Sequence, residues 1–249
     1  MNKYVMILSI LLVVVLLLVA CNRYINYENK SRDVYLEKYD FTNIKFKTGD
    51  IIFFRHDTPI YYHGDNGINM DVHVVKNISK TIVGFSQKYY SHVGMIVVLN
   101  NKPFVYHLTS KPHIDKFSGK SIIGTPSLVE MSEIQQYDGL LYLHRYKGEP
   151  IKFDENDIAK ISSMNIKLVG KIHEVVMKTF LGIGEYKDGY MTCADFTNFL
   201  LKYTKIKDED LKYKTAVDLE YIRNFVENNE KYYDSTPIMI NTVLSKALR

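Results

Sequence analysis

Cysteine and histidine are the residues of this chain best suited to nucleophilic chemistry. Cys193 is one of only two cysteines, and it follows Thr192 in the stretch MTCADFTNFLL. Thr192 and, three residues later, Asp195 resemble a capping box ahead of an apolar run, which predicts a helix that begins at Cys193. Unpaired N–H groups and the helix dipole stabilise a thiolate at such a position. A lone cysteine is more often an ordinary buried thiol, so the helix start alone leaves both interpretations open.

A cysteine nucleophile requires a base, and two of the eight histidines have suitable positions. His92 begins the apolar stretch HVGMIVVL, where Gly94 permits close approach of another backbone or a substrate. His107 lies in the next apolar stretch, PFVYHLTS. A hairpin that turns at the intervening NNK pairs residues whose numbers sum to about 201, which brings the two histidines near each other. We therefore expect a base and an orienting partner for Cys193.

The histidines also have alternative interpretations. A metal site built from His92 and His107 has no nearby acidic ligand in the sequence, so we expect neither a metal nor a cofactor. His144 and His173 lie in an apolar strand and an amphipathic helix, and we interpret both as structural.

The elements that must position these residues are strands followed by helices. Apolar patterns predict strands over 51–55, 91–99, 103–110 and 139–146, and helices over 74–90 and most of 153–182. The helix that begins at Cys193 follows, and the tail from Val217 to Arg249 is interpreted as two weakly helical pieces separated at Pro237. This order predicts an α+β fold in one domain, with an antiparallel sheet packed against helices.

The N-terminal residues 1–21 are predicted to attach the chain to a membrane. An unbroken apolar run from Tyr4 to Ala20 would span about 25 Å as a helix, the short limit for a transmembrane segment. One interpretation is a single-pass anchor; the other is a lipoprotein-type signal in which Cys21, in LVAC, would be acylated. Residues 22–44 are interpreted as a juxtamembrane linker and 45–249 as the domain, on a side of the membrane that the sequence does not determine.

Composition narrows the remaining classes of protein. With 249 residues and 46% hydrophobic content, the chain can bury a substantial core. Lys3 and Arg23 are the only charges before residue 24, so the remainder has 30 basic residues (32 less 2) against 28 acidic ones. That balance argues against a nucleic-acid partner. Two cysteines cannot form a disulfide framework, so the core must hold the fold.

Five short motifs carry a resemblance to a known family. In chain order they are TGDIIFFR, YSHVGMIV, FVYHLTS, LGIGEY and MTCADFTNFLL. The set resembles the circularly permuted branch of the NlpC/P60 papain-like superfamily, and within it the bacterial YaeF/YiiX-like and the poxvirus G6-like proteins. In that branch the histidine strand precedes the cysteine helix, as it does here. The likeness covers about residues 45–205.

The resemblance implies roles for individual residues. Cys193 matches the nucleophile and His92 the base, while His107 falls where the family places a third polar residue. That residue is often Glu, although the lecithin:retinol acyltransferase-like members use His. Tyr186, in GIGEY, resembles an element expected to help form the substrate pocket; its alternative role is packing under the helix. Ala194 stands where the family often has Ser.

The implied activity is that of a membrane-anchored cysteine hydrolase (an amidase, peptidase or esterase) or an acyltransferase, acting through an acyl-enzyme. Attachment to a membrane suggests a peptide, amide or lipid-acyl substrate. The alternative is a catalytically inactive, membrane-anchored structural or binding protein that retains the papain-like fold.

Overall fold

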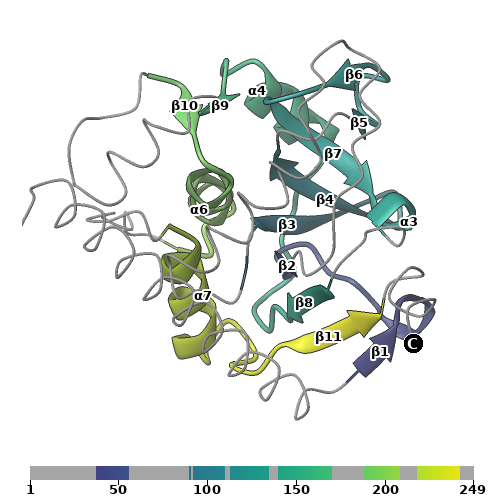
Figure 1. Cartoon of the computed structure of the whole chain (residues 1–249), viewed down its shortest axis with the longest axis vertical. Helices are drawn as coiled ribbons and strands as arrows, with labels where there is room; N and C mark the ends of the chain where they lie inside the picture. Colours follow the sequence, from purple (N-terminus) through teal and green to yellow (C-terminus); the bar gives the residue numbers. More distant parts are fainter. Residues whose placement is uncertain are drawn as a thin grey trace, which may run out of the picture.

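A mainly antiparallel sheet forms the centre of the molecule, with helices packed against it (Figure 1). The computed structural model describes residues 38–55, 90, 92–109, 113–134, 140–169, 188–207 and 218–241. The main sheet has seven strands in the order β1-β11-β8-β2-β3-β4-β7, and every neighbouring pair is antiparallel except β1 with β11. Their bounds are β1 Lys38–Asp40, β11 Ile238–Asn241, β8 Leu140–His144, β2 Ile51–Arg55, β3 His92–Leu99, β4 Lys102–Leu108 and β7 Pro126–Glu130.

The remaining elements are short strands and helices. Two separate two-stranded pairs join β5 (His113–Ile114) to β6 (Ser121–Ile122) and β9 (Lys167–Leu168) to β10 (Tyr190–Met191). The described helices are η1 Phe41–Asn43, α3 Met131–Ile134, α4 Glu155–Ser162, α6 Cys193–Tyr203 and α7 Asp218–Asn228. A mixed helix and strand protein with an antiparallel sheet is therefore confirmed.

The hairpin of β3 and β4 forms as the sequence predicts. Asn100 and Asn101 have φ values of 49° and 63°, which suit the two-residue turn that matches strand twist. Met95 pairs with Tyr106, so paired residue numbers sum to 201. The predicted strand over 51–55 is also confirmed as β2, and the one over 139–146 as β8.

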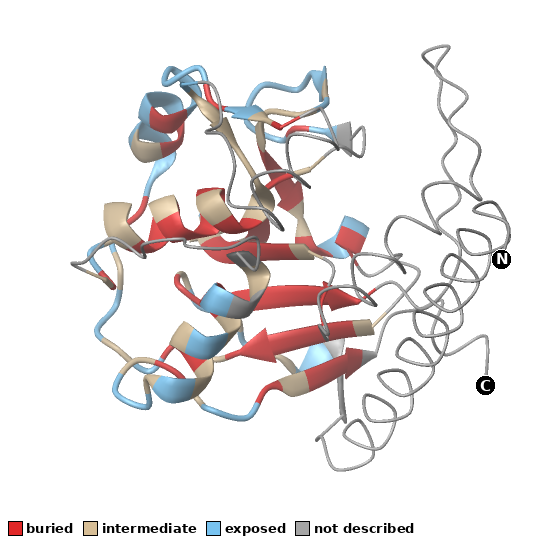
Figure 2. Cartoon of the chain, turned by 60° about the vertical axis from the view of Figure 1, so that its left-hand side comes forward, coloured by how far each residue is buried: buried red, intermediate tan, exposed pale blue. Residues whose placement is uncertain are grey.

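Side chains alternate across the sheet and build a hydrophobic cluster on each face. The first cluster joins Val93 and Met95 of β3 to the α6 residues Ala194, Phe196 and Leu200. The second cluster, on the other face, contains Ile52, Phe54, Ile96, Val105 and, from α3, Ile134. Figure 2 shows α6 and α7 on one side of strands that are buried along most of their length. The central strands are thus covered on both faces, which explains their nearly continuous apolar sequences.

The C-terminal segment differs from its prediction. Ile238–Asn241, directly after Pro237, form strand β11 rather than a helix, and residues 242–249 lie outside the described residues. Ile238, Met239 and Ile240 pair with β8, and Met239 and Ile240 are buried on opposite faces. A short apolar run has no helical period to distinguish it from a strand, so pairing decides its structure. The helix predicted before Pro237 is confirmed as α7.

The predicted helix over 153–182 is confirmed only in part. Within it the structure describes α4 followed by β9, and residues 170–182 lie outside the described residues, as does the helix predicted over 74–90 apart from residue 90. Strand β1 and η1 fall within the range predicted as linker, so the sheet begins before residue 45. Across the described ranges we find no helix of the length and apolar character needed to cross a bilayer; residues 1–37 lie outside those ranges.

Candidate functional site

His92 and His107 lie together, as their spacing on the hairpin predicts. The His92 Nε2 and His107 Nδ1 atoms are 2.9 Å apart, at hydrogen-bond distance, and the two ring centroids are 5.0 Å apart. His107 stands opposite Gly94 by the register of the hairpin, so it is diagonal to His92. The predicted proximity is confirmed.

Gly94 makes room for this arrangement. A Cβ atom at residue 94 would lie 2.8 Å from Val105 Cγ1 and 3.0 Å from His107 Cβ. Real Cβ contacts are essentially never closer than about 3.0 Å, so a side chain here would displace β4 and the His107 ring with it. The glycine in SHVG therefore permits the approach of two strands at the histidine pair.

Neighbouring residues contact both rings and the backbone of His107. The Phe54 ring lies 5.1 Å from the His92 ring and 6.2 Å from the His107 ring. Ser127, which pairs with His107 across β4 and β7, donates its hydroxyl to the His107 carbonyl at 3.3 Å. His107 is 6% exposed, whereas His92 is half-buried at the first position of β3. The His107 ring is thus a fixed, inner partner for a more accessible His92 ring.

The hydrogen bond limits which nitrogen of His92 can act as a base. A bond between two imidazoles requires one ring to donate and the other to accept. When His92 donates from Nε2 to His107 Nδ1, the His92 Nδ1 atom carries the lone pair that can accept a proton. A His92 imidazolium would strengthen the same bond by its charge. The pair can therefore hold one tautomer and stabilise the protonated ring.

Cys193 is the first residue of helix α6, as predicted. Its N-cap, Thr192, accepts a hydrogen bond on Oγ1 from the Asp195 N–H at 3.1 Å, and Asp195 Oδ2 accepts one from the Thr192 N–H at 2.9 Å. This reciprocal capping box is confirmed, with Asp at the position more often held by Glu or Gln. The Thr197 hydroxyl also donates to the Cys193 carbonyl at 2.9 Å. The backbone of Cys193 is thus fixed at the positive end of the helix.

The chain before Cys193 is fixed by the β9–β10 pair. The Lys167 N–H donates to the Gly189 carbonyl at 2.8 Å, and the Val169 N–H to the Met191 carbonyl at 3.0 Å. Gly189 has a φ of 81°, which turns the chain into β10. The entry to α6 therefore has a defined path two residues ahead of the cysteine.

The cysteine and the histidines approach the sheet from different faces. Cys193 is half-buried and packs against the first cluster, which α6 shares with β3. The rings of His92 and His107 lie beside Phe54, a member of the second cluster. Cys193 and the His92 ring therefore lie on opposite faces of the sheet, with His92 at the first position of β3.

The other predicted site residues lie outside the described residues. These are Tyr186, expected in a substrate pocket, and Cys21, expected as a lipidation site. His144 is fully buried and its Nδ1 atom lies 3.0 Å from the Asp234 carbonyl oxygen, which confirms its structural interpretation. In the part of the chain that the structure describes, no three His, Cys, Asp or Glu side chains are grouped to hold a metal ion.

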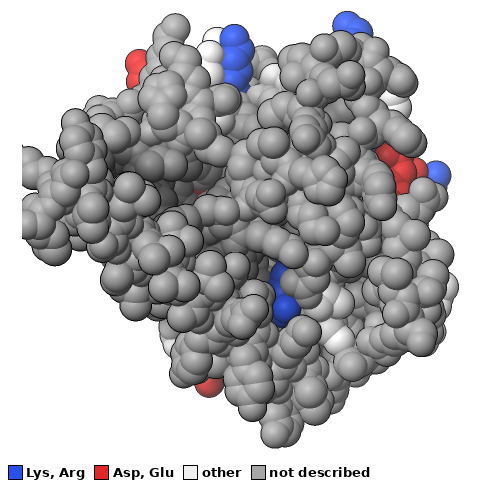
Figure 3. Space-filling view, in the orientation of Figure 1, with Lys and Arg blue, Asp and Glu red and all other residues white. Residues whose placement is uncertain are grey.

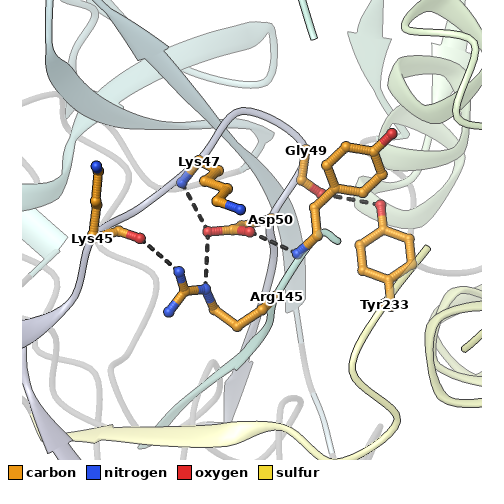
Figure 4. A network of polar contacts seen from close by, with 7 residues as sticks. Lys45, Lys47, Gly49, Asp50, Arg145 and Tyr233 are labelled. Carbon is orange, nitrogen blue, oxygen red and sulfur yellow. Dashed lines mark hydrogen bonds and ion pairs between the residues drawn. The ribbon is translucent and has the colours of Figure 1, made fainter. Parts of the chain in front are cut away.

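Sequence reasoning missed a buried polar network around Asp50, shown in Figure 4. Asp50 is fully buried and accepts hydrogen bonds from the N–H groups of Lys47 at 2.9 Å and Tyr146 at 2.8 Å. Arg145 Nε lies 3.7 Å from its Oδ2 atom. Burial raises the pKa of Asp50 from 3.8 to about 6, although these neighbours oppose the shift.

The Asp50 network has a structural role, because it lies at the end of β2 that is far from the histidine pair. Asp50 precedes the first residue of β2, whereas Phe54, the partner of His92, lies at the other end of that strand. The network joins the start of β2 to the segment after β8, and the Tyr233 hydroxyl donates to the Gly49 carbonyl at 3.0 Å beside it. The signal available in the sequence was an Asp directly before four consecutive apolar residues, in TGDIIFF.

Comparisons with known proteins find weak structural similarity to a solved structure. No family model matches the chain, and no curated protein matches it. Among solved structures, the chain is similar to the crystal structure of metalloprotein yiiX from Escherichia coli O157:H7, with 13% identity and a TM-score of 0.31. The match covers 77% of this chain and 87% of that one. At this similarity it carries no argument about chemistry, so any assignment rests on the residues themselves.

Proposed function

We propose that the protein is a thiol hydrolase or acyltransferase of the permuted NlpC/P60 type, with Cys193 as nucleophile, His92 as base and His107 as orienting residue. The observation that carries the proposal is the 2.9 Å contact between His92 Nε2 and His107 Nδ1 at the start of β3, the strand whose other face α6 covers. A base that is itself oriented by a third group is the arrangement that activates a cysteine nucleophile.

In the proposed reaction His92 Nδ1 accepts the proton from the Cys193 thiol. The thiolate attacks the carbonyl carbon of an amide or ester, and a carbon–sulfur bond forms while the bond to the leaving group breaks. His92 then protonates the leaving group. N–H groups at the start of α6, including that of Cys193, would stabilise the negative charge on the carbonyl oxygen.

His92 then deprotonates an acceptor, whose oxygen or nitrogen bonds to the acyl carbon. The carbon–sulfur bond breaks, and His92 returns the proton to the Cys193 sulfur. Water as acceptor gives hydrolysis; an alcohol or amine gives acyl transfer. The predicted membrane attachment through residues 1–21 favours a peptide, amide or lipid-acyl substrate close to a bilayer.

Trapping the acyl-enzyme tests this proposal. The full chain, in detergent, would be mixed with a chromogenic ester such as p-nitrophenyl acetate, and the cysteine peptides would be examined by mass spectrometry. We expect a burst of p-nitrophenol and an acetyl group on Cys193, both absent in Cys193→Ser and at least about tenfold slower in His92→Ala. If Cys193 acquires no acyl group, or acquires it at the same rate in His92→Ala, the protein is the inactive module instead.

A further inference from the structure

Exposed apolar side chains concentrate on the hairpin formed by β5 and β6. Five large hydrophobic residues are exposed among the described residues, and three of them lie between residues 114 and 123. Ile114 is 49% exposed, Phe117 43% and Ile123 56%. We name these three residues the apolar tip. Scattered single exposed hydrophobic residues are ordinary, whereas three on one short hairpin form a candidate interaction surface.

Hydrogen bonds join the turn of the hairpin to β7. Asp115 is 6% exposed and accepts hydrogen bonds from the N–H groups of Ser118 at 2.7 Å and Leu128 at 2.9 Å. The Lys116 N–H also donates to the Leu128 carbonyl at 3.1 Å. These bonds tie the turn to β7 and leave the side chains of the apolar tip directed outward.

Basic residues accompany the apolar tip. Lys120 on the hairpin and Lys167 on the adjacent β9 are exposed, and Lys116 forms an exposed ion pair with Glu133 at 2.8 Å. Figure 3 shows two separate groups of lysine or arginine atoms at the upper edge of the molecule, with aspartate or glutamate atoms at its upper left and right. Apolar side chains interspersed with lysines suit the boundary between acyl chains and anionic headgroups of a bilayer.

The size of the apolar tip also favours a bilayer over a protein partner. A stable protein interface buries about 800 Å² on each side, which three half-exposed side chains cannot supply. A membrane contact needs only a few inserted side chains, with electrostatic attraction to support them.

The hairpin is connected directly to the candidate site. The Gly124 N–H, just after the hairpin, donates to the Thr109 carbonyl at 2.9 Å, two residues beyond His107. The Gly124 carbonyl accepts a hydrogen bond from the Leu168 N–H at 2.7 Å, and Leu168 pairs with Met191, two residues before Cys193. A bilayer that binds the apolar tip would therefore lie close to β4, which carries His107, and to β10, which leads to Cys193.

We infer that the β5–β6 hairpin docks the domain on the surface of an anionic bilayer. The inference does not depend on the activity of Cys193. Docking by the hairpin is compatible with the predicted anchor. Strand β7 follows the hairpin, and six strand spacings, about 29 Å in total, separate β7 from β1. The sixteen residues from 22 to 37 can span up to about 54 Å, so anchor and hairpin can reach one bilayer.

Tryptophan fluorescence in lipid vesicles tests the docking. The chain contains no Trp, so Phe117→Trp in the full chain gives a single fluorophore at the apolar tip. Tyr221→Trp is the matched control, since Tyr221 is 38% exposed on α7, away from the hairpin. Both variants would be reconstituted into vesicles of phosphatidylcholine and phosphatidylglycerol, with and without lipids brominated in their acyl chains.

We expect blue-shifted emission and several-fold stronger quenching by brominated lipid for Phe117→Trp than for Tyr221→Trp. Adding Lys120→Glu should reduce the quenching of Phe117→Trp in anionic vesicles only. Equal quenching of the two fluorophores would overturn the inference, because the hairpin would then not face the lipid. Blue-shifted emission without quenching would also overturn it, by showing that protein covers the apolar tip. Acylation of Cys193, measured in the same samples, reports separately on the proposed function.

Discussion

His92 Nε2 and His107 Nδ1 lie 2.9 Å apart across the β3–β4 hairpin, so each ring restricts the tautomer of the other. In the proposed mechanism this leaves His92 Nδ1 to exchange a proton with Cys193. The arrangement differs from a histidine–carboxylate pair in one respect. A neutral His107 stabilises a His92 imidazolium through a hydrogen bond but adds no negative charge.

Replacing His107 tests its role as an orienting residue. His107→Ala removes the partner of His92 Nε2, and we expect the rate of Cys193 acylation by p-nitrophenyl acetate to fall by about tenfold or more. His107→Glu supplies a carboxylate, which should favour the imidazolium and move the alkaline limb of the pH–rate profile to higher pH. A purely structural His107 would leave the shape of that profile unchanged in both variants.

Gly94→Ala should disturb the histidine pair through packing. The added Cβ would meet Val105 and His107 at 3.0 Å or less, so we expect the free energy of unfolding to fall by about 1–3 kcal/mol, with slower acylation of Cys193. Denaturant unfolding and the acylation assay measure the two effects.

Gly119→Ala is the control for this prediction. Gly119 has a φ of 66°, and a Cβ there would meet no atom within 4 Å. Backbone strain should lower stability by about 1 kcal/mol and leave acylation unchanged. If Gly94→Ala and Gly119→Ala behave alike in the acylation assay, close approach at Gly94 does not support the histidine pair.

The capping box of α6 should stabilise the helix start that carries Cys193. Thr192→Ala and Asp195→Ala are each expected to lower the free energy of unfolding by about 1 kcal/mol. The double variant should lose less than the sum of both, because the two side chains cap each other. Thermal unfolding of the single and double variants checks this. Strict additivity would show that the two hydrogen bonds act independently.

Asp50 should make stability depend on pH in a specific direction. Its pKa is raised from 3.8 to about 6, so the folded state holds the proton more tightly than the unfolded state does. The contribution of Asp50 is therefore complete below about pH 4 and is lost as the pH rises through 6, by on the order of 3 kcal/mol. Asp50→Asn should remove this decline, which denaturant titrations from pH 4 to 7 would measure.

Glu133→Gln, at an exposed carboxyl, is the control for the Asp50 prediction and should keep the decline. If the pH dependence of the wild-type protein and of Asp50→Asn is the same, Asp50 has an ordinary pKa in the folded state.

Local patterns predicted the parts of the site that depend on neighbouring residues. The register of the β3–β4 hairpin followed from its two-residue turn, and the start of α6 followed from Thr192 and Asp195. Both are short-range effects, which the sequence expresses directly. The same reasoning identified His92 and His107 as neighbours.

Features that depend on distant pairing were not predicted. Strand β11 exists because Ile238–Asn241 pairs with β8, about a hundred residues earlier, and no local period marks it as a strand. The Asp50 network likewise needs Tyr146 and Arg145, which reach it only through the sheet. Helix α6 packs on the face of the sheet opposite the histidine rings. The sequence pattern does not determine which face of a sheet a helix covers.

The pH dependence of Cys193 alkylation tests the central claim most directly. The rate of reaction with iodoacetamide would be followed at Cys193 by peptide mapping, in the full chain and in His92→Ala, from pH 5 to 10. We predict that the wild-type rate reaches a plateau well below the ordinary thiol titration near about pH 8.5, and that His92→Ala returns the midpoint to that value. A wild-type midpoint near pH 8.5 that His92→Ala leaves unchanged would contradict a Cys193–His92 pair.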